Sequence, residues 1–221
     1  MREWVSLNGR LMPAEQAQVS VFDAGLMQGI GLFETMRAYD GVVFRLQRHL
    51  DRLGASARKL GWAVLPDPEE LCENVEQVVG AIEHEDTRVR LTVTTGTLRS
   101  TEQETPELTV IASASPGVKY PGECYTNGVT VLLPGYRQGA RDPTAGHKTT
   151  SYFSRLASLR EAHARGAFEA LWFNYDKHLA EGAISSVFLV QDDQLLTPPL
   201  DTPVLPGITR AVIQKLFNRP M

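Results

Sequence analysis

The spacing of hydrophobic residues predicts a mixture of helices and strands in the first half of the chain. From Leu46 to Leu60, apolar residues recur at intervals of three and four, as on the buried face of an amphipathic helix. After Pro66-Asp67-Pro68, a similar stripe predicts a second helix. Arg88–Thr94 alternates with a period of two, which indicates a half-buried strand. Further strands are expected at 4–11 (a hairpin turning at Asn8-Gly9), 33–38, 42–44 and 108–114, and residues 19–22 form a short strand or an extended lead-in.

The second half is richer in strand patterns and begins after a segment with proline and glycine. Helices are expected at 151–165 and 208–217, and strands at 129–133, 169–174, 186–190 and 194–197. Ser115-Pro116-Gly117 and Pro121-Gly122 resemble a linker. We therefore expect an α+β (mixed α/β) chain. An N-terminal α/β sandwich would span residues 1–116, a linker 117–127, and a β-barrel-like C-terminal domain 128–221.

Composition narrows the class of protein. The 221 residues are 43% hydrophobic and 22% charged, which is ordinary for a globular protein with a core. The formal net charge of −4 gives no bulk attraction to nucleic acid. Cys72 and Cys124 lie far apart, which favours a reducing compartment over a disulfide or zinc site. With no apolar run of membrane-spanning length and no signal-peptide pattern, we expect a cytoplasmic protein without membrane or metal.

Three features further along the chain carry candidate chemistry. Lys148 lies between a loop and a helix start, and a desolvated lysine amine can condense with an aldehyde. Glu181 follows about thirty residues later, and a carboxylate can keep a pyridine nitrogen protonated. Gly207, Ile208 and Thr209 begin a helix whose N–H groups can bind a phosphate. Each feature alone is more often a solvated lysine, a loop carboxylate or a helix start. Together, and in this order, they are the three kinds of group that binding pyridoxal 5′-phosphate would require.

Arg52, on the first helix, could add a fork of donors to the phosphate, although an ion pair with a neighbouring turn is the commoner role of such a residue.

Other chemistries find less support. A serine hydrolase would need a Gly-x-Ser-x-Gly turn, and the chain has none. Gly29-Ile30-Gly31 precedes an expected strand rather than following one, so it predicts no dinucleotide site.

Seven segments together resemble the class IV (fold type IV) pyridoxal-phosphate enzymes. That family includes branched-chain aminotransferases, D-amino acid aminotransferases and aminodeoxychorismate lyases. The resemblance covers nearly the whole chain, in order and in spacing. The segments are Phe22-Asp23-Ala24-Gly25, Gly29-Ile30-Gly31-Leu32-Phe33-Glu34-Thr35, His49-Leu50-Asp51-Arg52-Leu53, Lys148 with Tyr152, Glu181-Gly182-Ala183, Thr197-Pro198-Pro199, and Leu205-Pro206-Gly207-Ile208-Thr209-Arg210.

The resemblance implies a role for each site residue. Lys148 would link to the cofactor aldehyde and move the substrate proton, Glu181 would pair with the ring nitrogen, and Tyr152 would hydrogen-bond near the phenolic oxygen. The phosphate would be bound by Arg52, Gly207, Ile208 and Thr209. The substrate side would be lined by Phe33 and Arg37, with Arg90 able to reach a substrate carboxylate. The resemblance also implies a homodimer.

The departures from the family pattern bear on the substrate and on the end of the chain. Ile30 stands where the family often has aspartate, Ser186 where it often has asparagine, and the substrate-carboxylate arginine that D-amino acid aminotransferases carry near Thr95 has no counterpart. Glu181-Gly182-Ala183 resembles the branched-chain group, whereas Phe33-Glu34-Thr35 is nearer the lyases and the D-amino acid aminotransferases, so the motifs point to different subtypes. Because family members usually continue past the final helix, we expect the second domain, which ends at residues 218–221, to be truncated.

The leading hypothesis is a pyridoxal-phosphate-dependent aminotransferase acting on an α-amino acid, with branched-chain amino acids as the best single guess, and on a 2-oxo acid. An aminodeoxychorismate lyase that releases pyruvate is the nearest alternative. A truncated homologue that binds cofactor without turnover is the alternative of another class.

Overall fold

The computed structural model describes residues 3–98, 107–139 and 141–217, and it divides the chain into two compact units. Unit 1 comprises Met1–Lys119 together with Lys148–Ser151, and unit 2 comprises Tyr120–His147 and Tyr152–Met221. The expected linker over 117–127 and the domain bounds around it stay a prediction. The return of Lys148–Ser151 to unit 1 was not expected from the sequence. The chain end at 218–221 lies outside the described residues.

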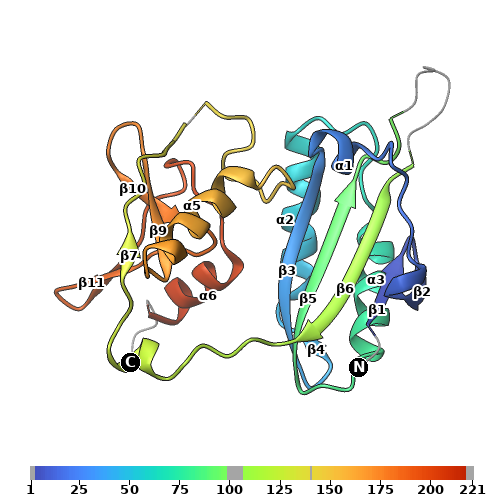
Figure 1. Cartoon of the computed structure of the whole chain (residues 1–221), viewed down its shortest axis with the longest axis horizontal. Coiled ribbons are helices and arrows are strands. Elements are labelled where there is room, and N and C mark those ends of the chain that lie inside the picture. The colour runs from blue at the N-terminus through green and yellow to red at the C-terminus, as the bar shows by residue number, and fades with distance from the viewer. Residues whose placement is uncertain (1–2, 99–106, 140, 218–221) are drawn as a thin grey trace. The chain divides into compact units, whose positions relative to one another are not determined.

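Unit 1 is built on an antiparallel sheet of six strands in the order β2-β1-β6-β5-β3-β4 (Figure 1). The expected hairpin at Asn8-Gly9 is confirmed, and so are the strands expected at 33–38 and 88–94, which the structure pairs with each other. The strands are β1 (Trp4–Leu7), β2 (Arg10–Pro13), β3 (Gly31–Tyr39), β4 (Val42–Val43), β5 (Asp86–Thr94) and β6 (Thr109–Pro116).

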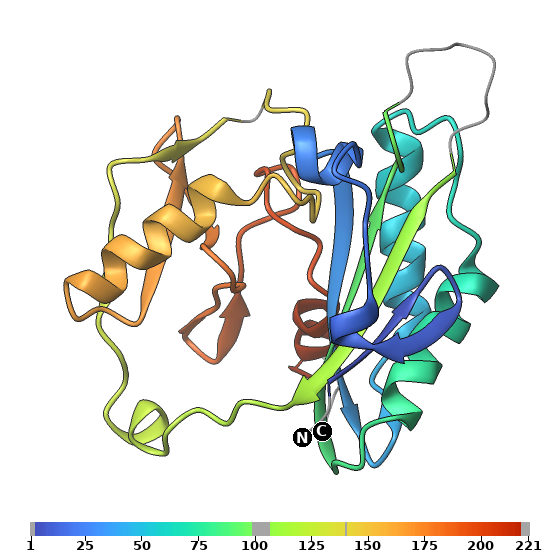
Figure 2. The same ribbon diagram turned by 45° about the vertical axis from the view of Figure 1, so that its right-hand side comes forward.

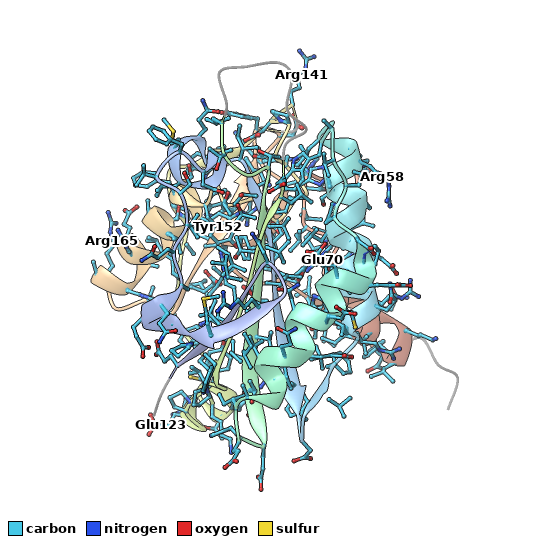
Figure 3. All side chains as sticks on the ribbon, turned by 90° about the vertical axis from the view of Figure 1, so that its right-hand side faces the viewer. Arg58, Glu70, Glu123, Arg141, Tyr152 and Arg165 are labelled. Atoms are coloured by element: carbon cyan, nitrogen blue, oxygen red, sulfur yellow. The ribbon has the colours of Figure 1, made fainter. Side chains whose placement is uncertain are left out.

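Two helices, α2 (Leu46–Lys59) and α3 (Pro68–Gly80), cover one face of this sheet (Figure 2). Their apolar stripes enclose the main core, which includes Leu53, Val75 and Leu91. Asp67 accepts a hydrogen bond from the Glu69 N–H, and Pro68 follows at the first turn, so α3 begins where a helix start is best stabilised. The outer sides of both helices are exposed, as at Arg58 and Glu70 in Figure 3.

Strand alternation gives this sheet two different faces. Leu32, Glu34 and Met36 on β3 are buried, and Leu32 and Met36 belong to the core beneath the helices. Phe33, Thr35 and Arg37 therefore point to the opposite face, because successive side chains alternate along a strand. The register pairs Thr35 with Arg90 on β5, so Arg90 lies on this second face too. The residues expected to contact substrate thus share one face of unit 1.

In residues 120–139, 141–147 and 152–217, unit 2 contains an open sheet, a separate hairpin and three helices. Strands β7 and β8 pair parallel with β9, β10 pairs antiparallel with β9, and β11 pairs with β12. The sheet does not close into a barrel in the part of unit 2 that the structure describes, because β7 and β8 are short and β11-β12 stands apart. The elements are α4 (Glu123–Thr126), β7 (Val131–Leu132), β8 (Arg137–Gln138), α5 (Phe153–Ala164), β9 (Glu169–Asn174), β10 (Leu179–Gly182), β11 (Leu189–Gln191), β12 (Gln194–Leu196) and α6 (Ile208–Phe217).

Residues 19–22, expected as a short strand or an extended lead-in, form no strand: the Asp23 N–H donates to the Ser20 carbonyl in a turn, and Asp23 then caps the short helix α1 (Ala24–Gln28). Glu181, expected between two strands, lies within strand β10, where it stands opposite Trp172 of β9. No helix in the described ranges is long and apolar enough to span a membrane.

Candidate active site

The segment that carries Lys148 lies along the edge of β3 in unit 1. The Phe33 N–H donates to the Lys148 carbonyl at 2.9 Å, and the Thr150 N–H donates to the Gly31 carbonyl at 2.9 Å. Thr149 forms an antiparallel bridge with Leu32. Because these bonds fix the backbone on both sides of Thr149, the position of Lys148 is set by a strand rather than by a free loop.

This close approach requires the glycines of Gly29-Ile30-Gly31. A Cβ at Gly31 would lie 2.8 Å from Thr150 Oγ1, and Gly29 adopts a φ of 69°, which disfavours other residues. The hydroxyl of Thr150 donates to the Gly29 carbonyl at 2.8 Å. Gly29-Ile30-Gly31, which is not a dinucleotide-binding motif, therefore serves to let the segment that carries Lys148 approach β3 closely. Glycines beside a strand are a known sign of close backbone approach.

Phe33 brings two cationic groups together on the second face of the sheet, opposite α2 and α3. The Lys148 Nζ lies 4.3 Å from the Phe33 ring centroid, and the Arg90 Cζ lies 3.7 Å from it. Such contacts between a cation and an aromatic face are favourable. Phe33 itself is only 3% exposed. The structure thus brings together three of the predicted site residues: the amine, an apolar ring and a guanidinium.

Arg37 lies further along the same face and is already engaged. Its Nε and Nη2 donate to the two carboxylate oxygens of Asp86. The Arg37 hydrogen bond holds the pKa of Asp86 below its ordinary value. Arg37 therefore forms part of an ion pair near the end of β3, and its expected contact with substrate stays a prediction.

Arg52 lies on the other side of the sheet, in a buried network centred on Glu34. Its Nε donates to Glu34 Oε1 at 2.8 Å and its Nη2 pairs with Oε2, while His49 Nδ1 lies 2.7 Å from Oε2. Burial acts to raise the pKa of Glu34, but the bonds from His49 and Arg52 outweigh it, and the pKa is lowered. The partner is thus a buried strand residue rather than a neighbouring helical turn. Phosphate binding by Arg52 stays a prediction.

Glu181 is a buried carboxylate of unit 2, with 4% of its surface exposed. Its Oε2 accepts the Leu205 N–H at 3.0 Å, and its Oε1 forms an ion pair with Arg155 of α5. Arg155 was not among the residues predicted from the sequence. The Tyr152 hydroxyl, labelled in Figure 3, donates to the Ala183 carbonyl at 3.3 Å. Glu181 and Tyr152 are therefore held around one short stretch of backbone.

The start of α6 provides the third feature of unit 2. The first helical hydrogen bond runs from the Ala211 N–H to the Gly207 carbonyl at 3.0 Å. The N–H groups of Ile208, Thr209 and Arg210 precede that bond, and such groups with the helix dipole favour an anion. The structure therefore places Gly207, Ile208 and Thr209 where the phosphate prediction requires a helix start.

These residues fit the chemical demands of pyridoxal phosphate. The aldehyde requires an amine (Lys148), the ring nitrogen a carboxylate shielded from water (Glu181), and the phosphate a set of N–H donors (the start of α6). No group of three histidine, cysteine, aspartate or glutamate side chains in residues 3–98, 107–139 and 141–217 could hold a metal ion.

Residues 31–219 match the family described as amino-transferase class IV. The chain belongs to this family. A putative branched-chain-amino-acid aminotransferase of Methanocaldococcus jannaschii is 33% identical over 214 residues, which cover 96% of this chain and 74% of that one. The solved branched-chain aminotransferase of Escherichia coli superposes with a TM-score of 0.88 at 28% identity, covering 98% of this chain and 74% of that one.

A further solved relative shows the cofactor. The branched-chain aminotransferase of T.th. with pyridoxamine 5′-phosphate has a TM-score of 0.86 at 27% identity, covering 98% of this chain and 73% of that one. Class IV aminotransferases depend on pyridoxal phosphate. The chain is therefore a pyridoxal-phosphate-dependent enzyme of the aminotransferase type, and its mixed α/β fold is that of the family.

Proposed function

We propose that the protein transfers the amino group of a branched-chain α-amino acid to a 2-oxo acid. The observation that carries the proposal is the Lys148 amine held over the Phe33 ring with Arg90 on the same ring. An apolar ring next to a guanidinium suits a substrate with an apolar side chain and a carboxylate. The relatives named as branched-chain aminotransferases support the same substrate class.

Each residue around the cofactor has a proposed role. Bound pyridoxal phosphate supplies the aldehyde carbon and an electron-accepting ring. Lys148 holds the cofactor through its amine and then moves the proton at the substrate Cα. Glu181 keeps the ring nitrogen protonated, and Tyr152 hydrogen-bonds near the phenolic oxygen. The phosphate is bound by Arg52, Gly207, Ile208 and Thr209.

On the substrate side, Phe33 provides apolar surface and Arg90 binds the carboxylate. Arg37, whose guanidinium is paired with Asp86, lines the far end of the same sheet face. Discrimination between amino acids then depends on how well a side chain covers Phe33, since apolar pockets distinguish single methylene groups only weakly.

The test is a screen of amino donors with 2-oxo acid formation as the readout. Leucine, isoleucine and valine should be turned over faster than D-alanine, and Lys148→Ala should lower kcat by at least about 100-fold, because the proton transfer loses its base. Lys59→Ala, at an exposed position of α2, is the matched control and should behave as wild type. Pyruvate release from aminodeoxychorismate without transamination would favour the lyase, and no turnover of any donor would contradict the proposal.

We also propose that the protein works as a homodimer in the cytoplasm. Support comes from the family resemblance for the dimer, and from the two free cysteines for a reducing compartment. Light scattering of the purified protein should give twice the mass of the chain. A monomer that retains full activity would contradict the dimer.

A further inference from the structure

Arg155 makes an unusually complete set of contacts around Glu181. Its Nη2 forms an ion pair with Glu181 Oε1. Its Nη1 lies 3.4 Å from the Gly182 carbonyl oxygen and 3.2 Å from that of Ala183. One guanidinium therefore contacts three consecutive residues, the first of which is the proposed partner of the cofactor ring. An arginine can do this because its planar group presents five donors in a fixed fork.

The guanidinium is itself held in place. Its Cζ lies 4.8 Å from the centroid of the Trp172 ring, and Trp172 stands opposite Glu181 in the β9-β10 register. The side chains of Arg155 and Glu181 are only 16% and 6% exposed. Screening by solvent is weak at such burial, so the orientation of the pair is strongly specified.

The same contacts link Glu181 to Tyr152. The Ala183 carbonyl accepts from the Tyr152 hydroxyl at 3.3 Å as well as from Arg155. Oε2 of Glu181 is meanwhile turned towards the Leu205 N–H, at the approach to α6. A change at Arg155 would therefore release one oxygen of Glu181 and disturb the carbonyl that Tyr152 uses.

We propose that Arg155 is a positioning residue that orients the Glu181 carboxylate towards the pyridine nitrogen of the cofactor. The inference rests on the proposed role of Glu181. Arg155 does not touch the reacting atoms: it acts on cofactor binding and on kcat through Glu181. Lysine at this position could keep the ion pair but not the bonds to both carbonyls, because an ammonium lacks the planar fork.

The experiment is a double-mutant cycle on cofactor affinity, measured by equilibrium dialysis of pyridoxal phosphate. Arg155→Gln and Glu181→Gln should each raise the Kd for pyridoxal phosphate about tenfold, because each change removes the binding free energy of about one charged hydrogen bond. Arg155→Lys should recover part of the loss. The double variant should bind no more weakly than Glu181→Gln alone, because Arg155 has then lost the group it orients.

Arg160→Gln, at an exposed position of the same helix, is the matched control and should leave Kd unchanged. Circular dichroism and urea unfolding show whether each variant folds. If Arg155→Gln does not fold, the same comparison is made with Arg155→Lys. Losses that add in the double variant would make Arg155 a purely structural residue and overturn the inference. Tighter binding by Arg155→Gln would overturn it as well.

The two proposals fail differently. If Glu181→Gln binds the cofactor like wild type, the proposed role of Glu181 is wrong. If Glu181→Gln binds weakly while Arg155→Gln does not, only the positioning role fails. As a second readout, Arg155→Gln should lower kcat by about the same factor as Glu181→Gln and change KM for the amino donor little, since neither residue is assigned to the substrate.

Discussion

Gly31→Ala, which adds one methyl group to β3, should displace the segment that carries Lys148. A Cβ there would lie 2.8 Å from Thr150 Oγ1 and 2.9 Å from its Cγ2. Separations this short do not occur between such atoms, so Gly31→Ala must push Thr150 away from β3. Because Thr150 is bonded through its N–H to Gly31, the shift reaches Lys148 two residues earlier.

The magnitude follows from the two contacts that the methyl group would make. Overpacking a tight site costs about 1–3 kcal/mol. Thr150→Ala removes both clashing atoms and leaves the Val93 carbonyl oxygen, at 3.1 Å, as the nearest neighbour. Thr150→Ala alone loses the hydrogen bond to the Gly29 carbonyl, which is worth about 1 kcal/mol. The double variant should therefore be about 1–2 kcal/mol more stable than the sum of the single changes predicts.

Urea unfolding of the wild type, both single variants and the double variant measures this coupling. In parallel, kcat should fall in Gly31→Ala and recover in part in the double variant, because Lys148 returns towards its place. Gly54→Ala on α2 is the control: its nearest new contact is 3.7 Å from Arg58 Nη1, so it should gain about 0.5–1 kcal/mol as helical glycine-to-alanine changes do. Strictly additive losses, or a Gly31→Ala protein with wild-type stability and activity, would refute the reasoning.

Three further outcomes are expected. Glu34→Gln should cost about 3 kcal/mol at neutral pH, because it removes the buried carboxylate charge with which Arg52 and His49 form ion pairs. Because its folded pKa is lowered, the Glu34 carboxylate adds to the free energy of unfolding above its unfolded pKa of about 4.3, and this contribution is lost as the pH falls towards the folded pKa. Urea unfolding at several pH values should therefore show a smaller loss of stability in acid for Glu34→Gln than for wild type. Arg52→Lys should raise the Kd for pyridoxal phosphate about tenfold, measured by dialysis, since a bidentate contact is lost. Asp23→Ala should lower stability in urea by about 2 kcal/mol, because the hydroxyls of Thr94 and Thr109 and the α1 cap lose their acceptor.

The elements with a strong hydrophobic period could be predicted from the sequence. Helix α6 and strand β9 begin and end where expected, and α2 is one residue shorter than its apolar stripe suggested. The short elements could not. Helix α1 depends on its cap at Asp23, and β8 exists only because Arg137 and Gln138 pair with β9. Pairing with a distant strand leaves no local pattern.

Within the site, individual residues could be predicted better than their partners. Lys148, Phe33 and Arg90 were each proposed from sequence, and they meet at one ring. Arg155 was not predicted because nothing in the local sequence marks it: its ion-pair partner, Glu181, lies 26 positions further along the chain. On α5 it looks like any arginine on a polar helix face. An ion pair between a helix and a strand follows from tertiary packing, which sequence spacing does not encode.

The network around Arg52 shows how one residue can combine a role in the fold with a role at a site. Glu34 is 1% exposed, and a carboxylate buried to this degree must be paired. Arg52 meets that need through Nε and Nη2, which fixes the plane of its guanidinium. A fixed plane lowers the entropy cost of binding a phosphate, since the side chain has no rotamers left to lose. Loss of phosphate affinity in an Arg52 variant therefore has to be measured on folded protein, and Arg52→Lys is preferred over a neutral change because it leaves Glu34 with a positive partner.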